Sequence, residues 1–371
     1  MTSASHTVPG PLEVDPAWKE TSDYESAESE YSTASLSESI RAYRYENGRR
    51  YHAYKDGRYN LPNDEAEQER LDIPTWKALL NNNRLDIFHH IYLLMLDGKL
   101  FRAPVGDDVQ RILDVGTGTG IWAIDVAEAH PTAEVVGTDL SPIQPSWVPP
   151  NVSFQIDDAE SDWTFARKSF DLIHIRHLNG GIKDWGRLIR QAFDALKPGG
   201  WLDIEEYEFT LQSDDGTLSD ESNLAKYYRL VNQAADLLAK AWLTSSFYLG
   251  LTLHKGQEFK IASSLDRFIL DAGFDNVHHE EMKLPLGTWP AEKKQKEMGA
   301  FFLLTTENAY EAFGMAFFTR TLGMTIPEAQ EVITAAKRES RSKKSHTYST
   351  QHLYYAQRPL EKSGPEESGP V

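Results

Sequence analysis

The sequence predicts an α/β protein built on a doubly wound, mostly parallel, seven-stranded sheet with helices on both faces. Two observations predict this fold class. Between residues 111 and 207, five apolar strand patterns alternate with helical patterns, which is typical of a parallel sheet covered by helices. A glycine-rich loop directly follows the first strand pattern and opens a helix, the position that a ligand-binding turn takes in such sheets.

Each element has its own signal in the sequence. Helices are expected at residues 121–129, which Gly120 opens, and at 184–196, which ends before the turn at 197–200. After a later helix at residues 263–274, two further strand candidates complete the sheet. In chain order, the seven strand candidates are residues 111–115, 134–139, 152–157, 170–175, 201–207, 277–287 and 352–359.

The segments outside the sheet differ in composition. Residues 1–40 hold eight acidic residues and one lysine among many serines, so we expect a disordered acidic tail. A helical preamble at residues 41–105, with its helix at 83–100, leads into the main α/β domain at 106–360. Two long connections in that domain, about 209–262 and 289–347, are expected to be helical insertions that form a lid over a substrate. Residues 361–371 are expected to be a second disordered tail.

Composition and charge exclude several function classes. The chain has 371 residues, no cysteine and a formal net charge of -18, which excludes thiol chemistry and argues against a broad nucleic-acid surface. No apolar run is long enough to span a membrane, and the amino terminus lacks the pattern of a signal peptide. We therefore expect an intracellular, cytoplasmic protein, with a nuclear location as the alternative, that acts on a small molecule or a protein.

The glycine-rich loop is the motif that carries the chemistry. After Asp114 the chain reads Gly116-Thr117-Gly118-Thr119-Gly120, and glycines there let a ligand approach the backbone closely. The spacing is G-x-G-x-G rather than the G-x-G-x-x-G of dinucleotide-binding folds. This difference favours S-adenosylmethionine over NAD as the cofactor.

Two acidic positions extend this site. Asp139 ends the second strand about twenty residues after the glycines, where a carboxylate can accept hydrogen bonds from both ribose hydroxyls. The third strand ends at Asp157-Asp158-Ala159, and we expect Asp158, beside Ala159, to accept a hydrogen bond from the adenine amino group.

In this order, the motifs resemble those of the class I methyltransferases, whose sheet is Rossmann-like. The phrases GTGIWAIDVA, DLSPIQPSWVPPN, DLIHIRHL, LKPGGWLDIEE and LYYAQRP are further similar to the fungal LaeA-like methyltransferases over most of residues 45–360. The resemblance implies that residues 106–360 are a methyltransferase domain acting in or around fungal secondary metabolism. It also implies cofactor contacts from Asp114, Gly116, Gly118, Asp139 and Asp158. The sequence departs from the family by an insertion at residues 73–86 and by its amino-terminal tail.

Methyl transfer requires alignment of the acceptor and, for a hydroxyl acceptor, a base. His177 follows the fourth strand and is the candidate base; a hydrogen-bonded structural histidine is the alternative. Of Glu205 and Glu206 on the fifth strand, alternation lets at most one face the pocket. Glu205 is a candidate for contacting the acceptor, with hydrogen bonding within the sheet edge and its helix cover as the favoured alternative for each glutamate. Tyr51 and His52 are candidates for closing over the site, with ordinary aromatic packing as the alternative.

No metal is expected. The pairs His89-His90 and His278-His279 are adjacent in sequence, so their side chains should diverge. The basic run at residues 337–344 is interpreted as a solvated helix end, with a nuclear import signal as the alternative. The aromatic stretch at residues 301–318 can serve as core, as pocket wall, or as both.

Three hypotheses of function follow. The first is an S-adenosylmethionine-dependent enzyme that methylates oxygen or nitrogen of a small molecule in a fungal secondary-metabolite pathway. The second is a LaeA-type nuclear regulator of secondary metabolism that acts through protein partners. The third is a scaffold that binds the cofactor without turnover, which the intact glycine loop argues against.

Overall fold

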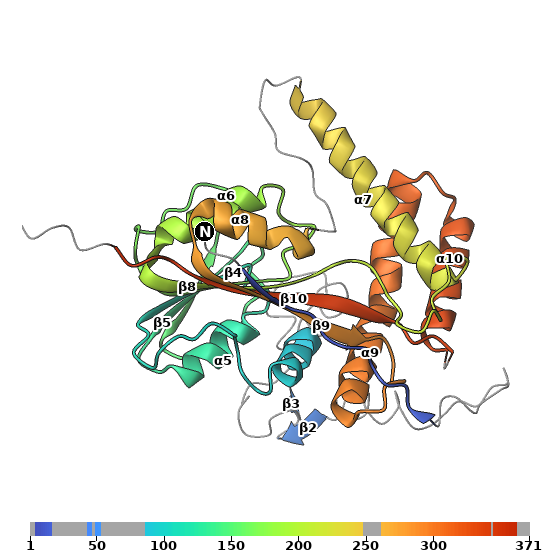
Figure 1. The fold of residues 1–371 in the computed structure, drawn as a ribbon, viewed down its shortest axis with the longest axis horizontal. Helices are drawn as coiled ribbons and strands as arrows, with labels where there is room; N and C mark the ends of the chain where they lie inside the picture. The colour runs from blue at the N-terminus through green and yellow to red at the C-terminus, as the bar shows by residue number, and fades with distance from the viewer. Residues whose placement is uncertain are drawn as a thin grey trace, which may run out of the picture.

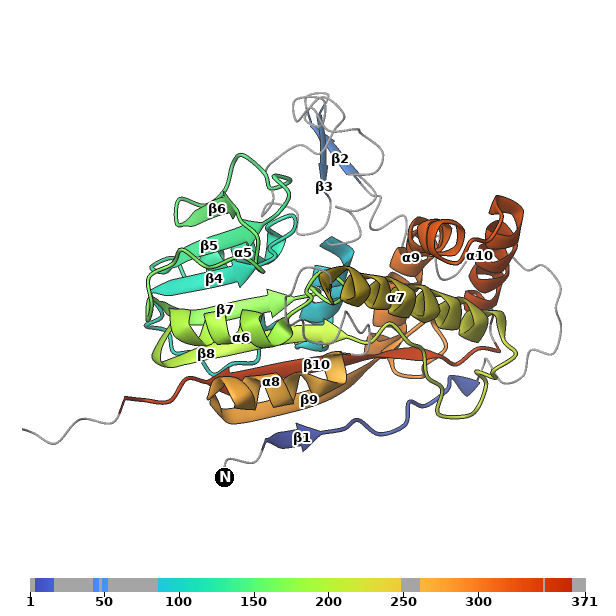
Figure 2. The ribbon, with the colours of Figure 1, turned by 90° about the horizontal axis from the view of Figure 1, so that it is seen from above.

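One sheet organises the protein. The computed structural model describes residues 4–16, 43–46, 49–52, 86–247, 261–342 and 344–361. Within this part, eight strands form a sheet in the order β1-β9-β10-β8-β7-β4-β5-β6, which can be followed across Figure 2. The strands are β1 (Ser5–Thr7), β4 (Arg111–Val115), β5 (Glu134–Asp139), β6 (Val152–Ile156), β7 (Phe170–Arg176), β8 (Leu196–Tyr207), β9 (Asp275–Pro285) and β10 (Tyr348–Gln357).

The pairing confirms the expected fold class. Strands β6, β5, β4, β7 and β8 pair in parallel, whereas β10 runs antiparallel to both β8 and β9. The order reverses direction at β4, which pairs with β5 on one side and β7 on the other. Ligands of such sheets bind at the carboxyl ends of the strands, beside this switch point.

Strand β8 begins earlier than expected. It starts at Leu196, which pairs with Phe170, and the register shifts before Trp201 pairs with Leu172. The expected turn at residues 197–200 is therefore an irregular start of the strand. At Gly200, an added Cβ would lie 3.0 Å from the carbonyl oxygen of Lys197 and 3.1 Å from that of Phe170, so the absence of a side chain permits this close backbone approach.

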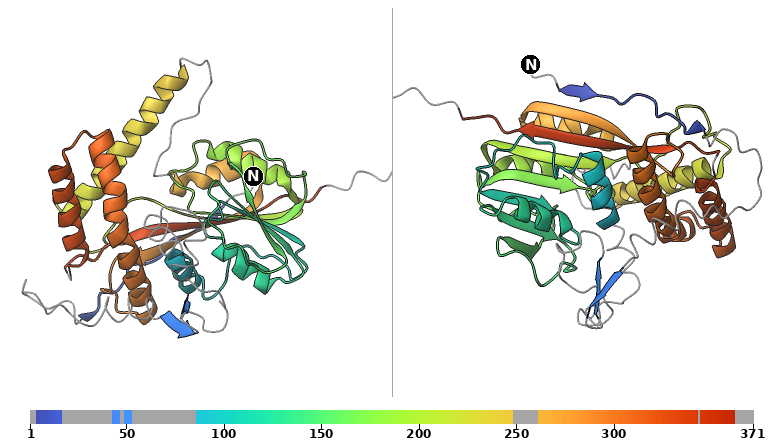
Figure 3. Two further views of the ribbon diagram at one scale, coloured as in Figure 1. Left: turned by 180° about the vertical axis from the view of Figure 1, so that it is seen from behind. Right: turned by 90° about the horizontal axis from the view of Figure 1, so that it is seen from below.

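Helices cover both faces of the sheet, as Figures 1 and 3 show. Helix α5 (Ile121–Ala129) and the helical residues 86–95 lie on one face, and α6 (Trp185–Ala195) and α8 (Leu265–Ala272) lie on the other. Asp184 caps α6, because its carboxylate accepts a hydrogen bond of 2.8 Å from the backbone N–H of Arg187. Separate apolar cores form beneath α5 and beneath α6 with α8.

The two long connections supply the expected helical insertions. Helices α7 (Asn223–Phe247), α9 (Lys293–Ala316) and α10 (Ile326–Ser340), with the π-helical turn η2 (Phe317–Thr321), gather at the carboxyl end of the parallel strands (Figure 2). They pack with the helical residues 86–95 around a third apolar core. Within the described part of the chain, no helix combines the length and the apolar character needed to cross a bilayer.

The amino-terminal segments differ from the expectation. Residues 4–16 were expected to be disordered, yet Ser5–Thr7 form β1, which adds an eighth strand by pairing in parallel with β9. Pairing satisfies backbone groups that the edge strand β9 would otherwise leave open, and Val14 forms a further bridge to Pro290. The preamble is not entirely helical, because β2 (Tyr43–Glu46) and β3 (Arg49–His52) form an antiparallel hairpin.

Candidate functional site

The glycine-rich loop joins β4 to α5 at the carboxyl edge of the sheet. Gly116, Gly118 and Gly120 have φ angles of 72°, 58° and 81°, the left-handed region in which glycine carries no steric penalty. A Cβ at Gly116 would lie 2.3 Å from Cδ2 of Leu178, and one at Gly120 would lie 2.3 Å from Cζ of Phe154. The loop is therefore packed from two sides, and a side chain at Gly116 or Gly120 would require an unfavourable positive φ as well as a shift of Leu178 or Phe154.

Asp114, near the end of β4, stabilises the glycine-rich loop by a hydrogen bond. Its carboxylate is buried and accepts a hydrogen bond of 2.5 Å from the hydroxyl of Thr117. The backbone N–H of Thr117 donates to the carbonyl oxygen of Thr138 at 2.8 Å. Burial raises the pKa of Asp114. In this arrangement Asp114 and Thr117 fix the shape of the loop, and a direct contact of either with a cofactor stays a prediction.

Asp139 links the loop to the end of β5. One carboxylate oxygen accepts from the backbone N–H of Gly118 at 2.8 Å, and the other accepts from that of Ser141 at 2.9 Å. A carboxylate has about four acceptor positions, so positions remain for the two hydroxyls of a ribose. The side-chain amide of Gln144 closes the same turn by donating to the carbonyl oxygen of Gly118 at 2.6 Å. These donors and acceptors fit a nucleoside placed over Gly118.

Asp158 lies in the turn after β6. It is exposed, and its oxygens accept from the backbone N–H of Glu160 at 2.9 Å and from the hydroxyl of Ser161 at 3.2 Å. The preceding residue ties this turn to the site, because the N–H of Asp157 donates to the carbonyl oxygen of Asp139 at 3.0 Å. The carbonyl oxygen of Ala159 accepts from the indole N–H of Trp163. A contact of Asp158 or Ala159 with adenine stays a prediction.

Asp86 belongs to this site but was not identified from the sequence. It lies at the start of the helical residues 86–95, and its carboxylate accepts a hydrogen bond of 2.9 Å from the hydroxyl of Thr119 in the glycine loop. Burial raises the pKa of Asp86 to about 6. The sequence signal was weak, since a single aspartate before a helix is most simply read as a helix-capping residue.

His177 lies directly after β7, between the glycine loop and the helical insertions. Its backbone has a φ angle of 56°, and its N–H donates to the carbonyl oxygen of Glu205 at 3.1 Å. The ring nitrogen Nε2 is 3.0 Å from the hydroxyl of Tyr92. Edge-to-face contacts with Phe88 and Tyr207, each with ring centroids 4.8 Å away, hold the imidazole from two further sides. The next residue, Leu178, is the one that packs over Gly116.

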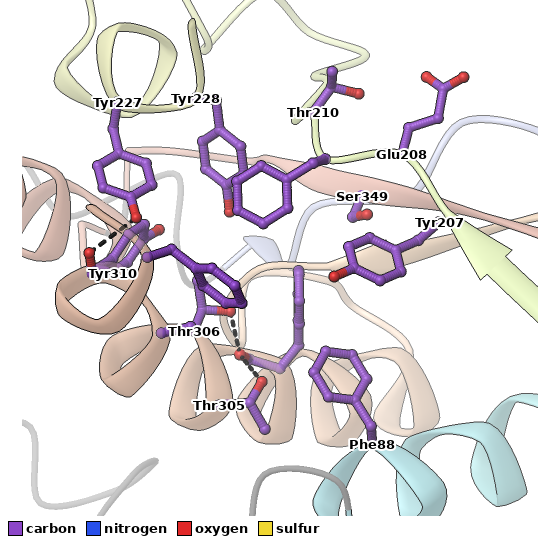
Figure 4. Close-up of a pocket in the computed structure, with 14 residues that line it drawn as sticks. Phe88, Tyr207, Glu208, Thr210, Tyr227, Tyr228, Thr305, Thr306, Tyr310 and Ser349 are labelled. Atoms are coloured by element: carbon purple, nitrogen blue, oxygen red, sulfur yellow. Dashed lines mark hydrogen bonds between the residues drawn. The ribbon is translucent and has the colours of Figure 1, made fainter. Parts of the chain in front are cut away.

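An aromatic pocket opens beside His177, and Figure 4 shows the side chains that line it. Its empty volume is about 470 Å³, part of which is open to solvent. Phe88 and Tyr207, which contact the His177 ring, form one end, and Tyr227, Tyr228 and Tyr310 form the other. The remaining lining residues are Glu208, Phe209, Thr210, Phe302, Thr305, Thr306, Ala309, Phe313 and Ser349. The aromatic stretch at residues 301–318 is thus both pocket wall and core.

Glu205 and Glu206, both fully buried at the end of β8, have different partners. Glu206 Oε1 accepts hydrogen bonds from the backbone N–H groups of Leu178 and Asn179. Glu205 lies 3.6 Å from the guanidinium of Arg176, and among the described residues neither of its carboxylate oxygens has a hydrogen-bond partner. Burial raises the pKa of Glu205 to about 7 and that of Glu206 to about 8. Glu206 therefore positions the loop that carries His177, whereas a contact of Glu205 with an acceptor stays a prediction.

The buried Glu206 predicts a pH dependence of stability. Because its pKa is higher in the folded protein than in the unfolded chain, the folded state binds more protons, and stability falls as pH rises from 4.5 to about 8. Glu206→Gln keeps a carbonyl acceptor but does not ionise. Urea unfolding at pH 5 and pH 8 measures the free energy of unfolding. Between these two pH values it should decrease less in the variant than in the wild type, with a difference of up to about 1.4 kcal/mol per pH unit. Equal declines in both proteins would contradict the burial of an ionising carboxyl here.

Two sets of sequence candidates lie outside this site. The backbone of Tyr51 and His52 lies in β3, but their side chains are outside the described part of the structure. The expected divergence within the histidine pairs is confirmed. His89 contacts Asp125, whereas His90 packs on Phe301.

The second histidine pair lies beside a cluster at the β1 edge of the sheet. His278 and His279 stack on Tyr355 and Tyr354, which project to opposite faces. The nitrogens of His6 and His279 and a carboxylate oxygen of Glu281 lie within 4.8 Å of one another. The two imidazoles are stacked with centroids 4.2 Å apart and planes 2° apart. Lone pairs of imidazole lie in the ring plane, so in this arrangement the two rings do not direct them at one ion.

Comparisons of the sequence with known proteins identify the family. A family model described as "Methyltransferase domain" matches residues 87–279. The methyltransferase pytC of Aspergillus terreus is 38% identical over 338 residues, which cover 91% of this chain and 94% of that protein. The secondary metabolism regulator laeA of Aspergillus fumigatus is 34% identical over 318 residues, 85% of this chain and 76% of that protein.

Among solved structures, phosphoethanolamine N-methyltransferase 2 of Haemonchus contortus, crystallised with S-adenosyl-L-methionine, is 19% identical with a TM-score of 0.42. That match covers 81% of this chain and 62% of the other. The family model covers more than half of the chain, and both curated relatives exceed 30% identity over most of it. The chain therefore belongs to the class I S-adenosylmethionine-dependent methyltransferases and, within them, to the fungal LaeA-like family.

Proposed function

We propose that this enzyme methylates an oxygen or nitrogen atom of a small molecule held in the aromatic pocket. The observation that carries the proposal is the position of His177. Its ring contacts Phe88 and Tyr207 of the pocket, and the adjacent Leu178 covers Gly116 of the glycine loop. An acceptor in the pocket and a cofactor on the loop would thus meet at this residue.

The residues at the glycine loop fit S-adenosylmethionine, the cofactor of this family. When bound, it supplies a methyl group on a positively charged sulfur. In the proposed complex, Asp139 accepts from the ribose hydroxyls, and Asp158 with Ala159 receives the adenine. We place the ligand against the backbone of Gly116, Gly118 and Gly120, a loop whose shape Asp114 and Thr117 hold; at Gly118 the absence of a side chain allows a close approach.

The chain's own residues would mainly align the acceptor and exclude water. The walls of the pocket are largely aromatic, and small-molecule sites are lined predominantly by apolar and aromatic side chains with a few polar groups. Such walls favour an aromatic or extended apolar acceptor. For a hydroxyl acceptor, His177 would take the proton as the new bond forms, which is the role of a general base.

A pocket-filling substitution tests the assignment of the acceptor site. Ala309 lines the pocket from α9, so Ala309→Trp should fill the hollow while leaving the glycine loop unchanged. We expect release of S-adenosylhomocysteine with a panel of phenols and aromatic amines to fall at least about tenfold. The affinity for S-adenosylmethionine, measured by calorimetry, should stay within about twofold. Ala309→Ser is the matched control, and full turnover by the tryptophan variant would exclude this pocket as the acceptor site.

A LaeA-type regulator acting through protein partners is the second candidate. It is favoured by the relative named as a regulator of secondary metabolism. The basic run gives it less support, because Lys337 pairs with Glu311 at 3.3 Å and Arg341 pairs with Glu307 at 2.5 Å at the end of α10. These ion pairs fit a solvated helix end. A fluorescent fusion expressed in a fungal host tests the second candidate, and exclusion of the fusion from nuclei would count against it.

A further inference from the structure

A chain of buried hydrogen bonds leads from β10 to His177. The side-chain amide nitrogen of Gln351 donates to the hydroxyl of Ser349 at 3.1 Å. The hydroxyl of Tyr92 donates to Oε1 of Gln351 at 3.0 Å, and the oxygen of Tyr92 is 3.0 Å from Nε2 of His177. Tyr92, Gln351 and Ser349 are each at most 2% exposed. Water therefore has little access to the groups that set the direction of these bonds.

The orientation of the Gln351 amide sets that direction. Its oxygen faces Tyr92 and can only accept, and Tyr92 donates its single hydroxyl proton to that oxygen. Burial raises the pKa of Tyr92 well above its usual value, so the phenol keeps its proton. The Tyr92 oxygen can then only accept from His177. Its partner atom Nε2 must carry a proton.

We propose that Tyr92 and Gln351 are positioning residues that hold neutral His177 as the tautomer with the proton on Nε2, leaving the lone pair on Nδ1. Only one part of this inference rests on the proposed function, namely that the Nδ1 lone pair takes a proton during methyl transfer. In that step the acceptor's O–H bond breaks and its proton moves to Nδ1. The acceptor oxygen forms the new bond to the methyl carbon, and the electron pair of the broken carbon–sulfur bond stays on sulfur.

The packing around His177 supports a single ring orientation. A rotation of the imidazole by 180° would place Cε1 against the Tyr92 hydroxyl and lose the hydrogen bond. The rings of Phe88 and Tyr207 contact the imidazole at centroid distances of 4.8 Å and restrict its rotation. The hydrogen bond to Tyr92 thus favours one ring orientation and one tautomer together.

The tautomer can be measured without any turnover. In protein labelled with ¹⁵N-histidine, long-range ¹H–¹⁵N spectra distinguish Nε2–H, Nδ1–H and doubly protonated rings. The signal of His177 among the 12 histidines is identified by its absence in His177→Gln. At a pH where the ring is neutral, we expect the Nε2–H form to exceed the other by about tenfold, the equivalent of one hydrogen bond. A wild-type ring with the proton on Nδ1 would overturn the proposal.

Two variants test the cause of the preference. In Gln351→Leu, the Tyr92 hydroxyl loses its acceptor and is free to donate to Nε2, so the proton should move to Nδ1. Tyr92→Phe should leave a mixture of both forms. Tyr354→Phe is the matched control, because Tyr354 is an equally buried tyrosine whose hydroxyl donates to the carbonyl oxygen of Ala262. An unchanged tautomer in folded Gln351→Leu would also overturn the proposal.

Activity separates this inference from the proposed function. If His177 is the base, Gln351→Leu should lower kcat at least about tenfold and alter its pH profile, with the Kd for S-adenosylmethionine unchanged. If His177→Gln retains full activity while the wild-type ring shows Nε2–H, the base assignment fails and the role of Tyr92 and Gln351 stands. The spectra therefore test the tautomer, and the rates test the base assignment, independently of each other.

Discussion

Asp139→Ala is expected to weaken the binding of S-adenosylmethionine by about 100-fold or more. In the proposed complex, the carboxylate accepts two charge-assisted hydrogen bonds from the ribose, each worth about 1.5–3 kcal/mol, and about 1.4 kcal/mol corresponds to tenfold in affinity. The substitution also removes the acceptor for the N–H of Gly118, which loosens the loop under the ligand. Calorimetric titration of the purified protein measures the effect.

Two further variants test whether the loss of affinity is specific to the carboxylate of Asp139. Asp139→Asn keeps the size of the side chain and one acceptor oxygen, so its loss of affinity should be intermediate. Asp162→Ala removes an exposed aspartate that pairs with Arg187 at the surface, where such pairs contribute little, and its affinity should equal that of the wild type. Unchanged binding by Asp139→Ala would show that the cofactor lies elsewhere, and absence of binding by the folded wild type would contradict the proposed cofactor site.

The sheet could be predicted from the sequence because its signals are local. The bounds of β4, β5 and α5 agree with those expected from apolar patterning and from the glycine that opens the helix. Strand β1 could not be predicted in this way. Its three residues lie in an acidic, serine-rich segment, and its pairing with β9 joins residues more than 270 positions apart.

The same distinction between local and distant signals applies to the site. The glycine loop and Asp139 follow consecutive strands, so the carboxyl edge of a parallel sheet brings them together. The aromatic pocket is built from Phe88, Tyr207, Tyr227, Phe302 and Ser349, which come from five separate segments. Each of these residues alone is an ordinary apolar or small side chain. Only the packing of the helical insertions against the sheet shows that they share a cavity.

His177→Gln is the substitution with the largest expected effect on catalysis. Glutamine keeps a polar side chain of similar length, and its amide can still donate to the oxygen of Tyr92, but it cannot take a proton. For a hydroxyl acceptor we expect kcat to fall by about 10²–10⁴-fold, the usual contribution of a general base. The Kd for S-adenosylmethionine should not change, because the cofactor contacts proposed above do not include the imidazole.

The pH profile decides whether a loss of activity by His177→Gln is chemical or structural. With a basic imidazole the wild-type kcat should rise with pH and then level off, whereas the glutamine variant should lack this rise. His130→Gln is the control, since His130 stacks on Phe101 on the α5 side of the sheet and should retain the wild-type rate. A glutamine variant with wild-type kcat would assign His177 to holding the loop through Glu205 and Tyr92. Methyl transfer would then depend on alignment of an acceptor that reaches the pocket already deprotonated, or on a neutral amine.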